Sequence, residues 1–205
     1  MASGRRHDPE TTKTAIVDAA EALFVTRGFA SVAISEIAKK SGVTKSLIHH
    51  YFGSKDELYR EVQRRGLEQY FVRQLSLIRD PSLGGEGTLR ASVEAFFRFH
   101  QGNPGVSRIM GWAELEGLKH PLTDLEQAVT REGIERIRRD QEKGVLRDDI
   151  EPEHVLATFL MLASRWFMFK DKVLEWARRD VDDPDADDRY LSDMLKIFFE
   201  GVVKR

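Results

Sequence analysis

Apolar residues recur along this chain at intervals of three and four positions, the spacing that places side chains on one face of an α-helix. The first such run extends from Glu10 to Arg27, and Gly28 stops it. Its apolar face consists of Ile16, Ala19, Ala20, Leu23 and Phe24. No segment shows the strict alternation of apolar and polar residues that is typical of strands. The pattern therefore predicts an all-α fold.

Glycine, proline and acidic residues divide the rest of the chain into further helices. We expect short helices at about 35–41 and 45–52, and a long helix at about 54–77. Five more are expected at about 88–101, 105–118, 122–143, 152–178 and 189–203, with one of the breaks at His120-Pro121. The polar residues 1–9 are predicted to form a flexible arm. Together with the first helix, the expected ranges give about nine helices.

The composition excludes several classes of protein. The chain of 205 residues contains no cysteine, so disulfides, thiolate zinc sites and a cysteine nucleophile are ruled out. Its apolar stretches, such as residues 155–163, are far too short to cross a bilayer. The first ten residues contain no apolar run that could serve as a secretory signal. We therefore expect a cytoplasmic protein without a membrane partner.

The charge is distributed unevenly between the two ends of the chain. Residues 1–55 carry a formal charge of +3, whereas residues 56–205 carry −5, and the whole chain carries −2. A basic head on an acidic body suits a protein that contacts nucleic acid at one end only.

The segment from Ile34 to Leu58, ISEIAKKSGVTKSLIHHYFGSKDEL, is the most informative part of the chain. Its two short helices flank a tight turn, at which Gly42 can adopt a positive φ. Thr44 is placed to cap the second helix, and Ser54 with Glu57 forms a predicted capping box for the next one. The residues expected to face inward are Ile37, Ala38, Val43, Ile48 and Phe52.

The outward face of the second short helix carries hydrogen-bonding side chains and one apolar contact. These residues are Lys45, Ser46, Leu47, His49, His50 and Tyr51. Such a mixture suits base edges and phosphates in a DNA major groove. The segment therefore predicts a helix-turn-helix that reads DNA, although a bare helical hairpin would share the same turn.

At this point the sequence resembles the TetR family of transcriptional regulators. The resemblance covers residues 13–58 and rests on AAEALF, F-x-S-V-x-I-S-E-I-A, S-G-V-T-K and Y-F-G-S-K-D-E-L. It implies DNA contacts from Ser35, Thr44, Lys45, Ser46, Leu47, His49, His50, Tyr51 and Lys55. His49 stands where the family usually has Tyr, and Leu47 where Thr is common. The operator sequence therefore cannot be transferred from another member.

The resemblance also implies a division of the chain into a helix-turn-helix domain at 10–53 and an effector-binding and dimerisation domain at 54–205. Members of the family bind a palindromic operator as homodimers, through a four-helix bundle made by the last two helices of each subunit. The last helix here has a strongly apolar face. The predicted dimer residues are Leu191, Met194, Leu195, Phe198, Phe199 and Val202.

Effector pockets in the family lie among the middle helices, which in this chain are rich in aromatic residues and methionine. Polar residues among them are useful pointers, because a buried polar group needs a partner. His100, Arg108, Glu114 and Glu116 are such residues. The predicted ligand-binding set is Phe97, His100, Arg108, Met110, Trp112, Glu114, Met161 and Trp166. The apolar bias favours a hydrophobic or aromatic effector.

Other constellations of residues do not fit a catalytic or metal site. The stretch from Asp183 to Met194 begins like a calcium loop but lacks the glycine and the final glutamate. No metal, cofactor or catalytic residue is predicted. The sequence thus favours a ligand-responsive repressor that is nucleoid-associated when bound to DNA. A small helical enzyme with an apolar substrate, and a dimeric ligand-binding or interaction module without operator-specific binding, are the alternatives.

Overall fold

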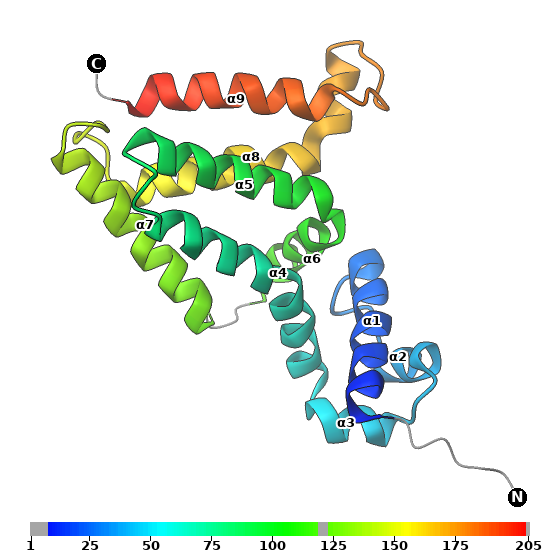
Figure 1. Ribbon diagram of the computed structural model, residues 1–205. Helices are drawn as coiled ribbons and strands as arrows, with labels where there is room; N and C mark the ends of the chain where they lie inside the picture. Colours follow the sequence, from blue (N-terminus) through cyan, green and yellow to red (C-terminus); the bar gives the residue numbers. More distant parts are fainter. Residues whose placement is uncertain (1–7, 119–122, 204–205) are drawn as a thin grey trace, which may run out of the picture. The chain divides into compact units, whose positions relative to one another are not determined.

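The computed structural model describes residues 8–118 and 123–203, and this part of the chain is built of α-helices (Figure 1). The helices are α1 Pro9–Arg27, α2 Ile34–Ser41, α3 Lys45–Phe52, α4 Lys55–Arg79, α5 Glu86–Gly102, α6 Pro104–Leu115, α7 Asp124–Glu142, α8 Pro152–Trp176 and α9 Ala186–Val202. The only β-type pairing between described residues is one isolated bridge, Leu146 with Val203. The predicted all-α fold is confirmed.

The described helix ends lie within three residues of those expected from the sequence. The first helix begins at Pro9 rather than Glu10, because Asp8 caps it and proline is favourable at the first helical position. The predicted break at His120-Pro121, the start of a helix at 122 and most of the predicted arm lie outside the described residues.

The chain forms two compact units. The first contains residues 8–67 and 108–118, and the second contains 68–107 and 123–203. The sequence-based boundary after residue 53 marks the start of α4, but the first unit continues to Leu67 and also includes most of α6. Both α4 and α6 therefore belong partly to each unit.

The first unit has a core that joins residues from five helices, α1, α2, α3, α4 and α6. Ile16 and Phe24 of α1, Ile37 of α2 and Ile48 of α3 are each at most 1% exposed. From α6, Ile109 adds a buried side chain to the same core. Tyr59 of α4 donates a buried hydrogen bond to the Ile109 carbonyl (3.0 Å). The helix-turn-helix is therefore held by residues from the whole unit, including a helix far along the chain.

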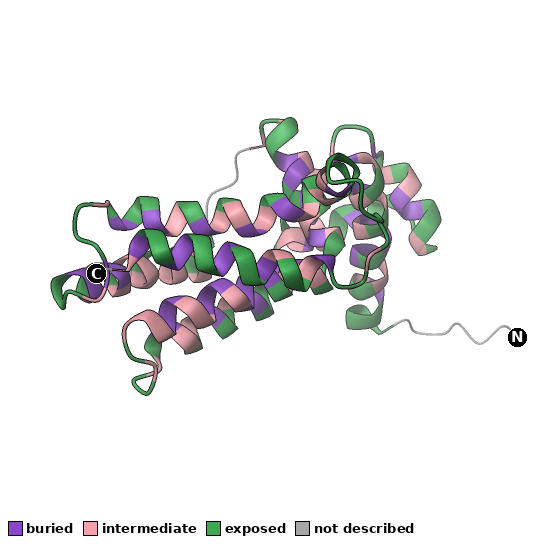
Figure 2. Cartoon of the chain, turned by 90° about the horizontal axis from the view of Figure 1, so that it is seen from above, coloured by how far each residue is buried: buried purple, intermediate pink, exposed green. Residues whose placement is uncertain are grey.

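In the second unit, α8 packs against α5, α7 and α9, and α5 also contacts α9 (Figure 1). Each of these helices has both buried and exposed residues, so one side packs in the unit and another faces outward (Figure 2). Thr123 starts α7 with a complete capping box: its hydroxyl accepts from the Glu126 N–H (3.2 Å), and the Glu126 carboxylate accepts from the Thr123 N–H (2.7 Å).

The apolar face of α9 belongs to the core of the second unit. Leu191, Met194, Leu195, Phe198, Phe199 and Val202, which the sequence assigned to a dimer interface, are all 9% exposed or less. Phe159 of α8 makes an edge-on ring contact with Phe198, and the Arg90 guanidinium lies 4.2 Å from the centre of the Phe199 ring. Because α8 and α5 already cover this face, the structure places these six residues in the core of the second unit, and their part in a dimer interface stays a prediction.

Candidate nucleic-acid interface

The turn between α2 and α3 has the geometry expected of a helix-turn-helix. Gly42 adopts a left-handed conformation with φ of 74°, and the Val43 N–H donates to the Ala38 carbonyl (3.1 Å). Among the residues expected to face inward, Ile37, Ala38 and Ile48 are buried. Val43 and Phe52 are partly buried and pack against the same core. The two helices are therefore held in a fixed relation by their apolar faces.

The first turn of α3 is fixed by Thr44, whose side-chain oxygen accepts from the Leu47 N–H (3.3 Å), as the sequence predicted. Beyond this cap, Lys45, Ser46, His49 and His50 are exposed, and Leu47 is partly buried. The hydrogen-bonding side chains of Lys45, Ser46, His49 and His50 are therefore accessible, whereas Ile48 is buried in the core.

His49 has a ring that is oriented by the backbone. Its Nδ1 lies 2.9 Å from the Gly53 carbonyl oxygen, which can only accept a hydrogen bond. Nδ1 must therefore carry a proton in this arrangement, and in the neutral ring Nε2 is left as an acceptor. An acceptor nitrogen on an exposed side chain suits the exocyclic amino group of adenine or cytosine in the major groove.

Tyr51 is only partly exposed and packs against the core of the first unit. Its ring makes an edge-on contact with His50, with ring centres 5.4 Å apart. The Lys13 ammonium lies 5.8 Å from the centre of the same ring. Tyr51 therefore has a packing role in α3, whatever it adds at DNA.

The start of α4 differs in one detail from the predicted capping box. The Ser54 hydroxyl oxygen accepts from the Glu57 N–H (3.1 Å), as expected. However, the Glu57 carboxylate accepts from the Ser54 hydroxyl (3.1 Å) instead of the Ser54 N–H, because that N–H donates to the Phe52 carbonyl (2.8 Å). The tight turn at Gly53 has already used the backbone donor.

Lys55 points toward the loop between α1 and α2. Its ammonium lies 4.2 Å from the centre of the Phe29 ring. Burial lowers the pKa of Lys55, and the nearby carboxylates of Glu116 and Glu36 partly oppose that change. A phosphate contact from Lys55 remains a prediction, and it would place the anion beside these two acidic groups.

Ser35, also predicted to reach DNA, is exposed in the first turn of α2. The residue beside it, Glu36, accepts from the Arg27 guanidinium (2.8 Å) and from the Ala33 N–H (2.9 Å). These bonds, the Arg27 bond first, lower the pKa of Glu36 to about 2. Arg27 and Glu36 thereby fix the start of α2 on the end of α1, a role that the sequence reasoning missed.

Glu116, which the sequence reasoning considered for a ligand pocket, has a structural position in the first unit. Its two carboxylate oxygens accept from the backbone N–H groups of Phe29 (3.0 Å) and Ala30 (3.1 Å). Ring atoms of Trp112 lie so close to Gly28 that they leave no room for a Cβ at that position. The C-terminal part of α6 and the residue after it therefore hold the loop between the first two helices.

The predicted ligand-binding residues fall into two groups. Arg108, Met110, Trp112 and Glu114 belong to the first unit, whereas Phe97, His100, Met161 and Trp166 belong to the second. Within the second unit, Phe97, His100 and Trp166 are buried, but Met161 is 63% exposed. The Trp166 indole N–H donates to Asp187 (2.8 Å). Their part in ligand binding stays a prediction.

The described residues, 8–118 and 123–203, contain no cluster of His, Asp or Glu side chains that could hold a metal ion. Among the same residues, no helix is sufficiently long and apolar to span a membrane.

A helical chain whose N-terminal unit presents α3 in this way defines a DNA-binding regulator of the helix-turn-helix class. Residues 16–62 match the family described as bacterial regulatory proteins, tetR family. Residues 89–192 match the Tetracyclin repressor-like C-terminal domain. The chain belongs to the TetR family, as its sequence motifs predicted, and it is a transcriptional regulator, so the enzyme alternative is set aside.

Similar proteins include a repressor and an activator. The HTH-type transcriptional repressor SCO4008 of Streptomyces coelicolor is 28% identical over 204 residues, covering 97% of this chain and 98% of the relative. The HTH-type transcriptional activator FasR of Mycolicibacterium smegmatis is 33% identical over 96 residues, which cover 47% of this chain and 43% of that protein.

Solved structures of other transcriptional regulators share the fold. The regulator KstR2 of Mycobacterium tuberculosis has a TM-score of 0.72 at 17% identity, with both chains fully covered. The transcriptional regulator SCO4942 of Streptomyces coelicolor has a TM-score of 0.70 at 23% identity, covering 95% of this chain and 99% of that one.

Proposed function

We propose that this protein is a repressor that binds a palindromic operator as a homodimer and releases it when a small, largely apolar effector binds. The observation that carries the proposal is the exposed polar face of α3, which presents Lys45, Ser46, His49 and His50 while Ile48 anchors the helix. A relative that spans nearly the whole chain is named a repressor, which supports this direction of regulation.

Selection of bound sequences from a pool of random DNA duplexes tests the proposal. We expect enrichment of an inverted repeat, because a twofold dimer presents two copies of α3 to half-sites about 34–36 Å apart. A bound pool without sequence enrichment, whose affinity falls steeply with salt, would instead favour the interaction module without operator-specific binding.

The dimer surface that we propose lies on the exposed apolar stripe of α8 and on α9. Along α8, Met161, Met168, Phe169 and Trp176 are 48–71% exposed, and on α9 Ile197 is 70% exposed. The four positions on α8 are spaced by seven, eight and fifteen residues from the first, which places them on one helical face. Large exposed apolar side chains that share a face are typical of an interaction surface.

The effector site that we propose lies among the aromatic side chains between α4 and α5 in the second unit. The ring of Tyr70 lies 5.4 Å from that of Phe96 and 4.9 Å from that of Phe99, and His100 contacts Phe96 edge-on at 4.5 Å. Burial lowers the pKa of His100 to about 4, so this ring is neutral at pH 7. A neutral, aromatic environment favours an apolar effector.

Hydrogen-bonding groups are embedded in this aromatic cluster. His100 Nδ1 lies 2.6 Å from the Ser107 hydroxyl, and Gln74 donates to the Ser92 carbonyl (3.0 Å). The Ser92 hydroxyl is buried without a partner among the described residues. Since buried polar groups are normally satisfied, Ser92 is a suitable contact for a polar group of the effector.

A fluorescent apolar amine tests the effector site. We expect N-phenyl-1-naphthylamine to bind saturably and to weaken operator binding, and His100→Leu to weaken its binding about threefold to tenfold. Asn103→Leu, at an exposed position whose side chain donates to the Phe99 backbone carbonyl, is the control and should bind like the wild type. Equal binding by both variants, or binding without any effect on the operator, would contradict the proposed site.

A further inference from the structure

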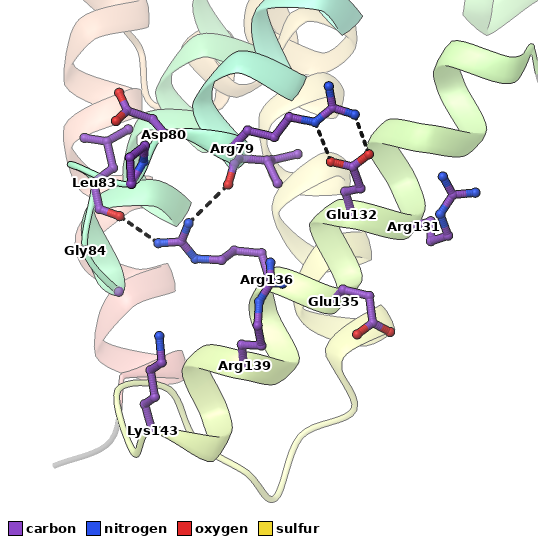
Figure 3. A pocket seen from close by; sticks show the side chains of 13 residues that line it. Arg79, Asp80, Leu83, Gly84, Arg131, Glu132, Glu135, Arg136, Arg139 and Lys143 are labelled. Atoms are coloured by element: carbon purple, nitrogen blue, oxygen red, sulfur yellow. Dashed lines mark hydrogen bonds and ion pairs between the residues drawn. The ribbon is translucent and has the colours of Figure 1, made fainter.

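The second unit contains a cavity of about 650 Å³ that is separate from its aromatic interior. One wall is formed by the end of α4 and the loop after it, residues 78–85, and the other by one face of α7 (Figure 3). Arg131, Glu135, Arg139 and Lys143 follow one another at intervals of four along this wall, so they share a helical face.

The cavity is basic, although the body of the protein is acidic. Five cationic residues line it against three carboxylates, whereas residues 56–205 as a whole carry −5. The cationic residues are Arg79, Arg131, Arg136, Arg139 and Lys143, and the acidic ones are Asp80, Glu132 and Glu135. Local charge of this sign, opposite to that of the surroundings, attracts anions into the cavity.

Two of the carboxylates are neutralised by arginines. Arg79 and Glu132 form a two-pronged ion pair, with N–O distances of 2.7 and 2.6 Å (Figure 3). This pair lowers the pKa of Glu132, to which the charges of Arg131 and Arg139 also contribute. Glu135 is paired with Arg138, which does not line the cavity.

The remaining carboxylate, Asp80, is used by its own loop. Its Oδ1 accepts from the Ser82 N–H (2.8 Å) and from the Ser82 hydroxyl (2.7 Å). These hydrogen bonds lower the pKa of Asp80 and keep it charged, so one negative charge remains at the end of the cavity formed by the loop.

Arg136 builds the wall of the cavity. Its guanidinium donates to the carbonyls of Ile78 (3.1 Å) and Leu83 (2.7 Å) and also pairs with Asp140 (3.1 Å). The Arg136 side chain is 17% exposed and that of Asp140 only 3%. Arg136 therefore fixes the α4–α5 loop against α7, so the cavity has a wall that does not depend on a bound molecule.

Three cations remain for a ligand. Among the described residues, no carboxylate lies within ion-pair distance of Arg131, Arg139 or Lys143, and all three side chains are exposed along the α7 wall (Figure 3). Guanidinium groups bind phosphates and carboxylates through paired hydrogen bonds, and an ammonium group adds a point charge. Arg131, Arg139 and Lys143 together carry +3 and Asp80 carries −1, so the cavity has a net positive charge of +2.

We propose that this cavity binds a small molecule that carries at least two negative charges, held by Arg131, Arg139 and Lys143. The site uses none of the residues assigned above to DNA or to the apolar effector. It gives the protein a second ligand, chemically opposite to the first, on the surface of the same unit.

Calorimetric titration of the full-length protein with pyrophosphate and with citrate, at constant ionic strength, tests this site. We expect saturable binding of at least one of these anions at one site per chain. Pyrophosphate binding more tightly indicates a phosphate-bearing ligand, and citrate binding more tightly a polycarboxylate. Arg139→Gln combined with Lys143→Gln should weaken the preferred anion about tenfold or more, because two charge-assisted contacts are lost.

The matched control is Arg73→Gln combined with Lys196→Gln, which removes an arginine and a lysine from exposed positions of the same unit outside the cavity. This control should bind the anion as the wild type does. Arg131→Gln provides a second, single substitution in the site, and circular dichroism verifies that each variant is folded. Equal losses in the site and control variants, or no saturable binding of either anion at millimolar concentration, would overturn the proposal.

Discussion

Replacing both Lys45 and His49 with alanine is expected to reduce operator affinity to the level of nonspecific DNA binding. Each base-edge contact contributes about 1–3 kcal/mol, and a dimer loses each of the two contacts twice, so the sum is about 4–12 kcal/mol. That sum is comparable to the gap of about 4–10 kcal/mol between specific and nonspecific binding. Fluorescence anisotropy with the selected operator, at fixed salt, measures the loss.

Both side chains are exposed and outside the core of the first unit, so the double variant should keep its fold and its oligomeric state. The control, Arg73→Ala with Lys196→Ala, removes two cations from the second unit and should leave operator binding unchanged. Full operator affinity in the Lys45 and His49 variant would show that the outward face of α3 does not read DNA.

The second large effect is expected at the proposed dimer surface. Two contacts, Tyr190 to the Leu162 carbonyl (2.9 Å) and Phe159 to Phe198 (ring centres 6.3 Å apart), show that α8 and α9 run side by side here. Met161→Glu combined with Ile197→Glu would place four carboxylates in the interface. Because each unpaired buried charge costs several kcal/mol, we expect the dissociation constant of the dimer to rise at least about a hundredfold.

Sedimentation over a range of protein concentrations measures this change, and operator affinity should fall with it. Val72→Glu combined with Val181→Glu introduces the same charges at two other exposed apolar positions of the second unit. This control should sediment like the wild type. An unchanged dimer in the Met161 and Ile197 variant would place the subunit contact on another face.

The helix-turn-helix could be predicted from the sequence because its signals are local. Gly42, Thr44 and Ser54 act on residues no more than a few positions away, and each has the predicted backbone role in the structure. The fixed ring of His49 could not be predicted, because its hydrogen bond depends on the direction of the Gly53 carbonyl at the end of α3.

Which apolar face of α8 and α9 is buried and which is exposed was harder to predict, for a physical reason. The periodicity of α9 shows that one face is buried, but it does not show whether the same subunit or a second one covers that face. Along α8, Phe159, Leu160, Met161 and Leu162 are consecutive apolar residues, so the pattern does not separate the core face from the outer one. Only packing distinguishes buried Phe159 from exposed Met161.

The structural role of Glu116 also could not be predicted from the local sequence pattern. Its partners Phe29 and Ala30 are 87 and 86 residues away along the chain. From the sequence alone, a glutamate that follows an amphipathic helix is as compatible with a position on the protein surface as with a position in a ligand pocket. Tertiary structure alone brings its carboxylate to two backbone donors of the first unit.

The division of α6 between the two units has a consequence for protein engineering. A chimaeric regulator made by joining residues 1–67 to a foreign sensor domain would lack Ile109. The Ile109 side chain lies in the core of the first unit, and its carbonyl accepts a hydrogen bond from Tyr59. The chimaera would also lack Glu116, which holds the loop after α1. The first unit is therefore discontinuous in sequence, and a chimaera that transfers it to another sensor domain must include residues 108–118 as well as residues 1–67.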